Sequence, residues 1–209
     1  MSVEKIAAQI HWLGHDSFRI DAGPTIYFDP FRIEPGPTAD IIFISHDHYD
    51  HCSPEDVAKI QGPETVIVTS QSCAMKLTGT LQVVAPGESL TVKGIPVRVV
   101  PAYNINKKFH PKKKGWLGFV VQIDGVRFYH AGDTDLIPEM LEIQADIALL
   151  PVSGIYVMTA EEAAEAALTI KPALAVPMHY GTLVGEAADA ERFSRLLEGK
   201  IQVKILEKD

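Results

Sequence analysis

Cysteine is scarce in this sequence, with only Cys52 and Cys73 among 209 residues. Two thiols are too few for a framework of disulfides, and such usage is typical of a protein in a reducing compartment. We therefore predict a cytoplasmic location. Cys52 could lie near a functional site, but a buried structural thiol is the commoner case, and we expect the latter.

Long apolar runs and targeting signals are also missing. No apolar stretch approaches the roughly 20 residues that cross a bilayer. The first residues, Met1 to Lys5, contain no basic region followed by an apolar core. We therefore expect neither a secretion signal nor a membrane span.

Positive charge is in deficit, because 19 Lys and Arg residues face 27 Asp and Glu residues, giving a net charge of −8. Nucleic-acid binding would require a basic surface, so it is disfavoured. At this length, with 46% hydrophobic residues, we predict one domain over residues 1–209 with a full core. The composition leaves homo-oligomer formation open.

The sequence does contain a histidine-rich segment at residues 45–52, Ser-His-Asp-His-Tyr-Asp-His-Cys. It follows the apolar run 41–44, which predicts a buried β-strand, and it precedes a predicted helix start at Ser53. His46 and His48 leave the same face if the strand continues that far. Three imidazoles and a carboxylate suit zinc or a similar divalent metal. A chance cluster in a polar loop is disfavoured, because three of the eight histidines fall here.

Turn signals and apolar periodicity divide the chain into short elements. Strands are predicted at residues 9–13, 17–21, 25–28, 41–44, 65–69, 81–84, 89–92, 95–100, 116–123, 126–130, 146–150, 173–176 and 201–206. Helices are predicted at residues 54–61, 70–77, 159–170 and 187–197, and residues 102–115 are predicted to form a long loop. This mixture of hairpins and strand–helix–strand units predicts an α/β fold.

Several polar side chains follow directly after predicted strands. His46 and His48 come after one strand, Asp133 after a second and His179 after a third. Loops at one edge of a rigid scaffold commonly carry functional residues. We therefore expect these side chains to converge at one edge of the sheets.

Three of these segments resemble motifs of the metallo-β-lactamase superfamily. They are the HxHxDH spacing at 46–51, Gly-Asp-Thr at 132–134, and Pro-Met-His-Tyr-Gly-Thr at 177–182. The segments 12–15 and 29–31 resemble one branch of it, which contains ascorbate-6-phosphate lactonase and N-acyl phosphatidylethanolamine phospholipase D. The resemblance implies an αββα sandwich of two mixed sheets with helices on the outer faces.

The resemblance also implies a binuclear metal site. The implied ligands are His46 and His48 for one metal, Asp50, His51 and His179 for the other, and Asp133 as the bridge. Two zinc ions are expected, with manganese, nickel and iron as alternatives. Such a centre supplies a metal-bound hydroxide for hydrolysis, and the catalytic role of Asp50 would be to orient it.

Two further residues, Asp29 and His15, each allow two interpretations. Asp29 is expected to accept a hydrogen bond from the outer nitrogen of a ligating histidine, although it could simply begin a loop. His15 either lines the pocket or pairs locally within a turn.

The sequence departs from the family in one place. Many relatives carry a histidine where this chain has Asn104, so the first metal lacks an obvious third protein ligand. An amide oxygen is poorly matched to an imidazole-rich site. His110 lies six residues further on. Each doubling of loop length costs only about 0.6 kcal/mol in closure entropy, so a slightly longer loop costs less than that. We favour His110 over Asn104.

Five lysines, including Lys107, lie between residues 107 and 114 of this acidic chain. They form either a solvated surface loop or a rim that attracts anions. On the second interpretation the protein is a metal-dependent hydrolase of a phosphorylated or otherwise anionic small molecule, such as a phosphodiester. The alternatives are a lactone or amide hydrolase and a non-catalytic metal-binding or redox iron protein.

Overall fold

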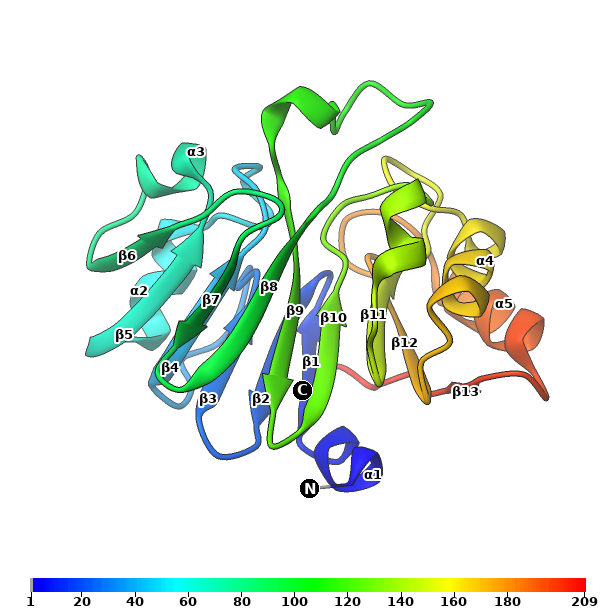
Figure 1. Ribbon diagram of the computed structural model, residues 1–209, viewed down its shortest axis with the longest axis horizontal. Helices are drawn as coiled ribbons and strands as arrows, with labels where there is room; N and C mark the ends of the chain where they lie inside the picture. The colour runs from blue at the N-terminus through cyan, green and yellow to red at the C-terminus, as the bar shows by residue number, and fades with distance from the viewer. Residues whose placement is uncertain (1) are drawn as a thin grey trace.

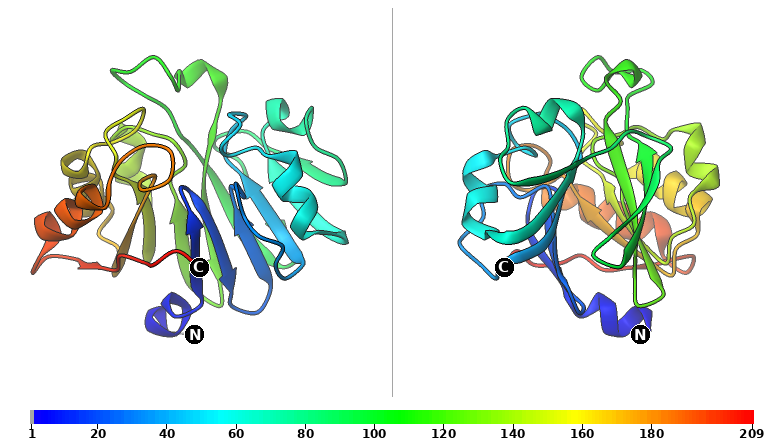
Figure 2. Two further views of the ribbon diagram at one scale, coloured as in Figure 1. Left: turned by 180° about the vertical axis from the view of Figure 1, so that it is seen from behind. Right: turned by 60° about the vertical axis from the view of Figure 1, so that its left-hand side comes forward.

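The computed structural model describes residues 2–209, which form two mixed β-sheets packed face to face with helices on their outer sides (Figures 1 and 2). The first sheet consists, in spatial order, of β1 (Ile10–Gly14), β2 (Ser17–Asp21), β3 (Thr25–Phe28), β4 (Ala39–Ile44), β5 (Gln61–Thr69) and β6 (Thr80–Val83). The second consists of β13 (Gln202–Val203), β12 (Leu174–Met178), β11 (Ile147–Pro151), β10 (Val126–His130), β9 (Leu117–Ile123), β8 (Ile95–Pro101) and β7 (Ser89–Val92). The predicted αββα sandwich is confirmed.

Short helices cover the outer faces. α2 (Pro54–Ile60) and α3 (Gln71–Ala74) lie on the side of the first sheet, and α4 (Ala160–Ile170) and α5 (Ala187–Leu197) lie on the side of the second. α1 (Val3–Ala7) lies at one end of the sandwich (Figure 1), and 3-10 turns form at Lys112–Lys114 and Pro138–Glu142. A capping box of Thr159 and Glu162 begins α4, since each side chain accepts a hydrogen bond from the other residue's backbone N–H. No helix among residues 2–209 is long and apolar enough to cross a membrane.

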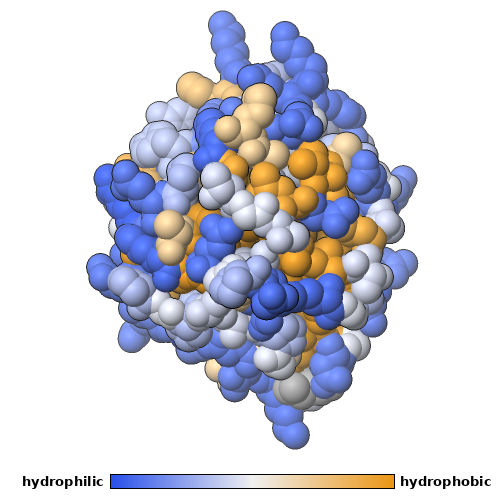
Figure 3. All heavy atoms as spheres, turned by 90° about the vertical axis from the view of Figure 1, so that its left-hand side faces the viewer, coloured by the Kyte–Doolittle hydropathy of each residue, from blue (hydrophilic) through white to orange (hydrophobic). Residues whose placement is uncertain are grey.

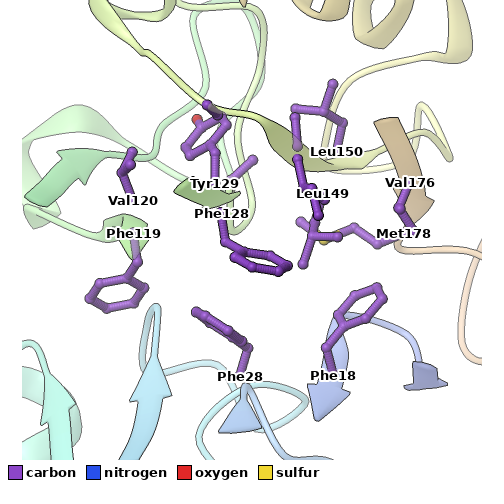
Figure 4. Close-up of a cluster of buried hydrophobic side chains, with 14 of the residues drawn as sticks. Phe18, Phe28, Phe119, Val120, Phe128, Tyr129, Leu149, Leu150, Val176 and Met178 are labelled. Atoms are coloured by element: carbon purple, nitrogen blue, oxygen red, sulfur yellow. The ribbon is translucent and has the colours of Figure 1, made fainter. Parts of the chain in front are cut away.

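The core lies between the two sheets, where strand residues alternate between inward and outward directions. Phe18 and Phe28 of the first sheet face Phe119 and Phe128 of the second (Figure 4), and all four are at most 1% exposed. A second apolar cluster, between the first sheet and α2, contains both cysteines. The predicted burial of Cys52 is therefore confirmed.

Strand direction explains why the polar turns meet. β1 and β3 are both antiparallel to β2, and β3 is parallel to β4, so all three end at the same edge of the first sheet. In the second sheet β8, β10 and β12 also run in one direction. The turns that follow these six strands therefore gather at one edge of the sandwich.

The predicted strand at residues 201–206 is wrong in length, because only Gln202–Val203 pairs with β12. After Lys204 the chain crosses to the first sheet, where the N–H of Asp209 donates to the carbonyl of Trp12 at 3.0 Å. The predicted helix at residues 70–77 is also too long, since α3 ends at Ala74. The short elements α1, Lys112–Lys114 and Pro138–Glu142 were not predicted, because each is a single turn without helical periodicity.

The side of the molecule that carries β5, β6 and α3 has hydrophobic surface among its hydrophilic side chains (Figure 3). Two exposed apolar side chains, Met75 after α3 and Val83 in β6, belong to these elements. β6 is an edge strand, and exposed edges are sites where strands of other chains can pair. Homo-oligomer formation stays a prediction.

We predict that Phe128→Ala lowers the free energy of unfolding by about 3–5 kcal/mol, because it removes a ring that is 0% exposed between the sheets. Urea unfolding measures the change. Leu141→Ala is the control, since Leu141 is 78% exposed and its loss should cost less than about 0.5 kcal/mol. Equal losses for the two variants would contradict the assignment of Phe128 to the core.

Candidate metal centre

Six turns at one edge of the sandwich carry a cluster of histidines and aspartates. They contribute His15 and Asp16 after β1, Asp29 after β3, His46, His48, Asp50 and His51 after β4, His110 after β8, Asp133 after β10 and His179 after β12. Nearly all of these side chains are buried, with His48 and Asp50 partly exposed. The structure thus brings together the residues predicted as metal ligands.

The first group consists of His46, His48, His110 and Asp133, whose ligand atoms all lie within 4.8 Å of one another. Nε2 of His46 lies 3.0 Å from Nδ1 of His48, and Nε2 of His110 lies 3.0 Å from Oδ2 of Asp133. Three imidazoles and one carboxylate are the donor set of a tetrahedral zinc site. His110, rather than Asn104, therefore completes this group of side chains.

Asn104 instead orients His110. Its Oδ1 accepts from the N–H of His110 at 2.9 Å and lies 3.1 Å from Nδ1 of the same residue. The carbonyl of Tyr156 lies 3.2 Å from the same Nδ1. These acceptors favour a proton on Nδ1, which leaves the lone pair of Nε2 facing the centre.

The loop that carries His110 is held by Asp135. One carboxylate oxygen accepts from Asn104 Nδ2 at 3.0 Å and from Lys107 Nζ at 2.6 Å, and the other accepts from the N–H of Ile105 at 2.9 Å. The side chain of Lys107 is therefore committed to this ion pair. Its role in substrate binding stays a prediction.

The second group consists of His15, Asp16, His51 and His179, again within 4.8 Å of one another. Asp50 lies beside it, with Oδ2 at 3.3 Å from Nε2 of His15 and 4.0 Å from Nε2 of His51. His15 therefore lies in this buried group, and its function there stays a prediction.

Asp133 connects the two groups. Its Oδ2 lies 3.9 Å from Nε2 of His46 and 3.4 Å from Nε2 of His179, and its Oδ1 lies 3.4 Å from Nε2 of His51. The preceding Gly132 has a φ of +61°, and a Cβ there would lie 2.7 Å from the carbonyl oxygen of Leu117. Only glycine lets the chain place Asp133 here without a clash.

Asp29 has the predicted supporting role, because its Oδ2 accepts from Nδ1 of His51 at 2.8 Å. It also accepts from the backbone N–H of Ser45 at 2.7 Å. Three residues of the centre have positive backbone φ angles, namely His15 at 54°, Asp29 at 39° and His179 at 60°. Such backbone strain in residues other than glycine concentrates at functional sites.

Electrostatics divides the centre into neutral and charged groups. Burial, reinforced by His51, holds the pKa of His46 well below its ordinary value. Burial alone would raise the pKa of Asp133, but His51 and His179 hold it well below the ordinary value. Burial alone would lower the pKa of His51, but Asp133 and Asp29 raise it well above. Without metal, the negative charge of Asp133 is thus balanced by a protonated His51.

Several buried nitrogen and oxygen atoms that could bind a metal have no hydrogen-bonding partner among residues 2–209. At the centre these include Nδ1 of His15, Nε2 of His51, Oδ1 of Asp133 and both carboxylate oxygens of Asp16. Leaving buried polar atoms unpaired is costly. Nitrogen and oxygen atoms that converge in this way fit divalent metal ions.

Three residues of the centre were missed from the sequence. Asp16 was assigned to a hairpin turn, yet its carboxylate is 0% exposed and lies 3.8 Å from Nδ1 of His51. Trp116 was assigned to a strand, yet its ring packs against the imidazoles of His46 and His48. The third is Ser153, whose Oγ lies 2.9 Å from Nδ1 of His179. Only long-range pairing places these side chains, so no local pattern could have indicated them.

The paired-sheet sandwich and the centre at its edge define a class of protein. A family model described as the beta-lactamase superfamily domain matches residues 9–179. The chain therefore belongs to the metallo-β-lactamase superfamily, as the resemblance implied.

Within that superfamily, the chain is 32% identical over 215 residues to a UPF0173 metal-dependent hydrolase from Pyrococcus abyssi, a match that covers 95% of this chain and 96% of that protein. A UPF0173 metal-dependent hydrolase from Thermoplasma acidophilum is 36% identical over 204 residues, with 90% of each chain covered. The crystal structure of a candidate metal-dependent hydrolase from Parabacteroides distasonis is similar with a TM-score of 0.86 and 32% identity, covering 96% of this chain and 93% of that one. The protein belongs to the UPF0173 metal-dependent hydrolase family. The narrower resemblance to ascorbate-6-phosphate lactonase and the phospholipase stays a prediction.

We predict that His110→Ala removes about one metal ion per chain, because the first group loses its third imidazole. Asn104→Ala should retain full stoichiometry at saturating metal but bind about 10–100-fold more weakly, because Asn104 only orients His110. Elemental analysis and metal titration of the two variants separate these outcomes. Loss of stoichiometry in Asn104→Ala alone would contradict the assignment.

We also predict that metal binding releases about one proton per chain at neutral pH, because the ion displaces the proton of His51. The raised pKa of His51 sets the sign. Below that pKa the apparent metal affinity should increase with pH, and above it the dependence should level off. Calorimetric titrations in buffers of different ionisation enthalpy measure the release, and heats that do not depend on the buffer would contradict it.

Proposed function

We propose that the protein hydrolyses a phosphodiester or another phosphate-bearing ester of a small molecule at a binuclear metal centre in the cytoplasm. The observation that carries this proposal is the position of Asp133 between two groups of imidazoles. We propose zinc in both positions, with manganese, nickel or iron as alternatives. When bound, two such ions lower the pKa of a coordinated water and polarise the attacked bond.

The protein's own residues supply orientation and charge. Burial opposes ionisation of Asp50, but contact with His15 and His51 lowers its pKa to about 2, so it is a carboxylate at neutral pH. It is partly exposed and lines the cavity above the centre. In the proposal Asp50 accepts a hydrogen bond from the attacking water and orients it toward the substrate.

The charge that attracts an anionic substrate comes in this proposal from the metal ions and not from the lysine-rich loop. Lys107 is paired with Asp135, and Lys112 is paired with Glu139 at 2.7 Å. Among residues 2–209, no lysine lines the cavity above the centre. A lactone or amide hydrolase is the second candidate, and the uncharged, partly apolar wall of that cavity favours it.

We expect the metal-loaded protein to hydrolyse phosphodiesters faster than lactones, amides or thioesters in a common panel. His48→Ala should lower metal content and abolish hydrolysis, and Asp50→Asn should lower kcat by about 10²–10⁴-fold. His11→Ala is the matched control, because His11 pairs with Asp209 away from the centre. Wild-type metal content and rates in His48→Ala would refute the site, and a faster lactone reaction would establish the second candidate.

A further inference from the structure

A cavity of about 440 Å³ opens directly above the metal centre. Its floor is formed by polar residues of the centre, His48, Asp50, His110 and Asp133. Its walls are formed by a different kind of side chain, namely Tyr49, Phe109, Tyr156, Leu183 and Val184. The lining therefore combines polar side chains of the centre with apolar side chains from neighbouring turns.

Three aromatic side chains of the wall are left in contact with solvent. Tyr49 is 67% exposed, Phe109 is 52% exposed and Tyr156 is 39% exposed. Single exposed apolar residues are common, but a contiguous group lining a cavity marks a binding surface. The rings of Phe109 and Tyr156 meet edge to face with centroids 4.4 Å apart, and this contact keeps both at the wall.

Tyr156 has a strained backbone conformation, and its carbonyl is held by polar contacts. Its φ of +70° is disfavoured for an aromatic residue. Its carbonyl accepts from Nδ2 of Asn104 at 2.8 Å and lies 3.2 Å from Nδ1 of His110. The positions of Tyr156 in the aromatic wall and of His110 in the centre therefore depend on the same hydrogen-bonding network.

We propose that the Phe109–Tyr156 wall binds an apolar group, of about the size of a phenyl ring, that is attached next to the bond broken at the metals. The preferred substrate is then a small ester whose reacting end is polar and whose adjacent substituent is aromatic or branched aliphatic. The size fits, because cavities of roughly 300–1,000 Å³ hold small organic ligands. This inference rests on the proposed function for the reaction, but the binding preference can be measured without turnover.

The test uses metal-loaded protein and two phosphonates with the same head group, methylphosphonate and benzylphosphonate. By calorimetry, benzylphosphonate should bind about tenfold more tightly, since a modest apolar contact is worth about this factor. Phe109→Ala should reduce the ratio to about two and leave the affinity for methylphosphonate unchanged. Tyr156→Gly should do the same, because glycine accepts the positive φ without strain. Leu141→Ala, at an exposed position outside the cavity, is the control and should retain the full ratio.

Turnover gives a second measurement. Methyl p-nitrophenyl phosphate and benzyl p-nitrophenyl phosphate have the same leaving group, p-nitrophenol. The benzyl ester should have about tenfold higher kcat/KM, and Phe109→Ala should remove this difference. If neither ester is hydrolysed but benzylphosphonate binds preferentially, the proposed reaction fails and the aromatic site stands. Equal binding of the two phosphonates, or a preference that survives both wall variants, would overturn the inference.

Discussion

The carboxylate of Asp133 is the group on which the arrangement of this molecule depends. It is 4% exposed, and imidazoles from both sheets and from one long loop surround it. A buried carboxylate is tolerated only when opposite charge and hydrogen bonds compensate for lost hydration. Either a proton on His51 or metal ions must supply that charge, and the surrounding histidines are placed so that either can do so.

Rigid strands position most of this centre, and one loop completes it. His46, His179 and Asp133 directly follow strands whose neighbours fix them on both sides. His110 has no such support, and its position depends on Asn104 and Asp135. The polar network under the loop therefore substitutes for the strand that the other ligands have. Two lysines of this loop, Lys107 and Lys112, form ion pairs with Asp135 and Glu139 and do not line the cavity.

Much of this could be predicted from the sequence. The apolar run before His46 and the capping residues of α4 are local patterns, so their elements follow from periodicity and side-chain hydrogen bonding. The strand ends indicated that His46, Asp133 and His179 would converge. Asp16 and Trp116 could not be found, because nothing within a few residues of either indicates which distant side chain it will contact. The length of the last strand was wrong for the same reason. The backbone N–H of Lys204 still donates to Ala175 of β12, but its side chain donates to the carbonyl of Ala7 in α1, and Asp209 then donates to Trp12 of β1.

The spread of the centre along the chain has a consequence for its biosynthesis. His48 and His179 are separated by more than a hundred residues, which a ribosome adds in about ten seconds at roughly 5–20 residues per second. During that interval the first histidines precede the rest of the centre, because Asp133 is added partway through and His179 only at the end. A nascent chain can present isolated imidazoles to cellular metal, but it cannot enclose an ion between both sheets. Metal capture at the complete centre is therefore a late event that follows synthesis of nearly the whole domain, and the residues that would hold the ion come from both halves of the chain.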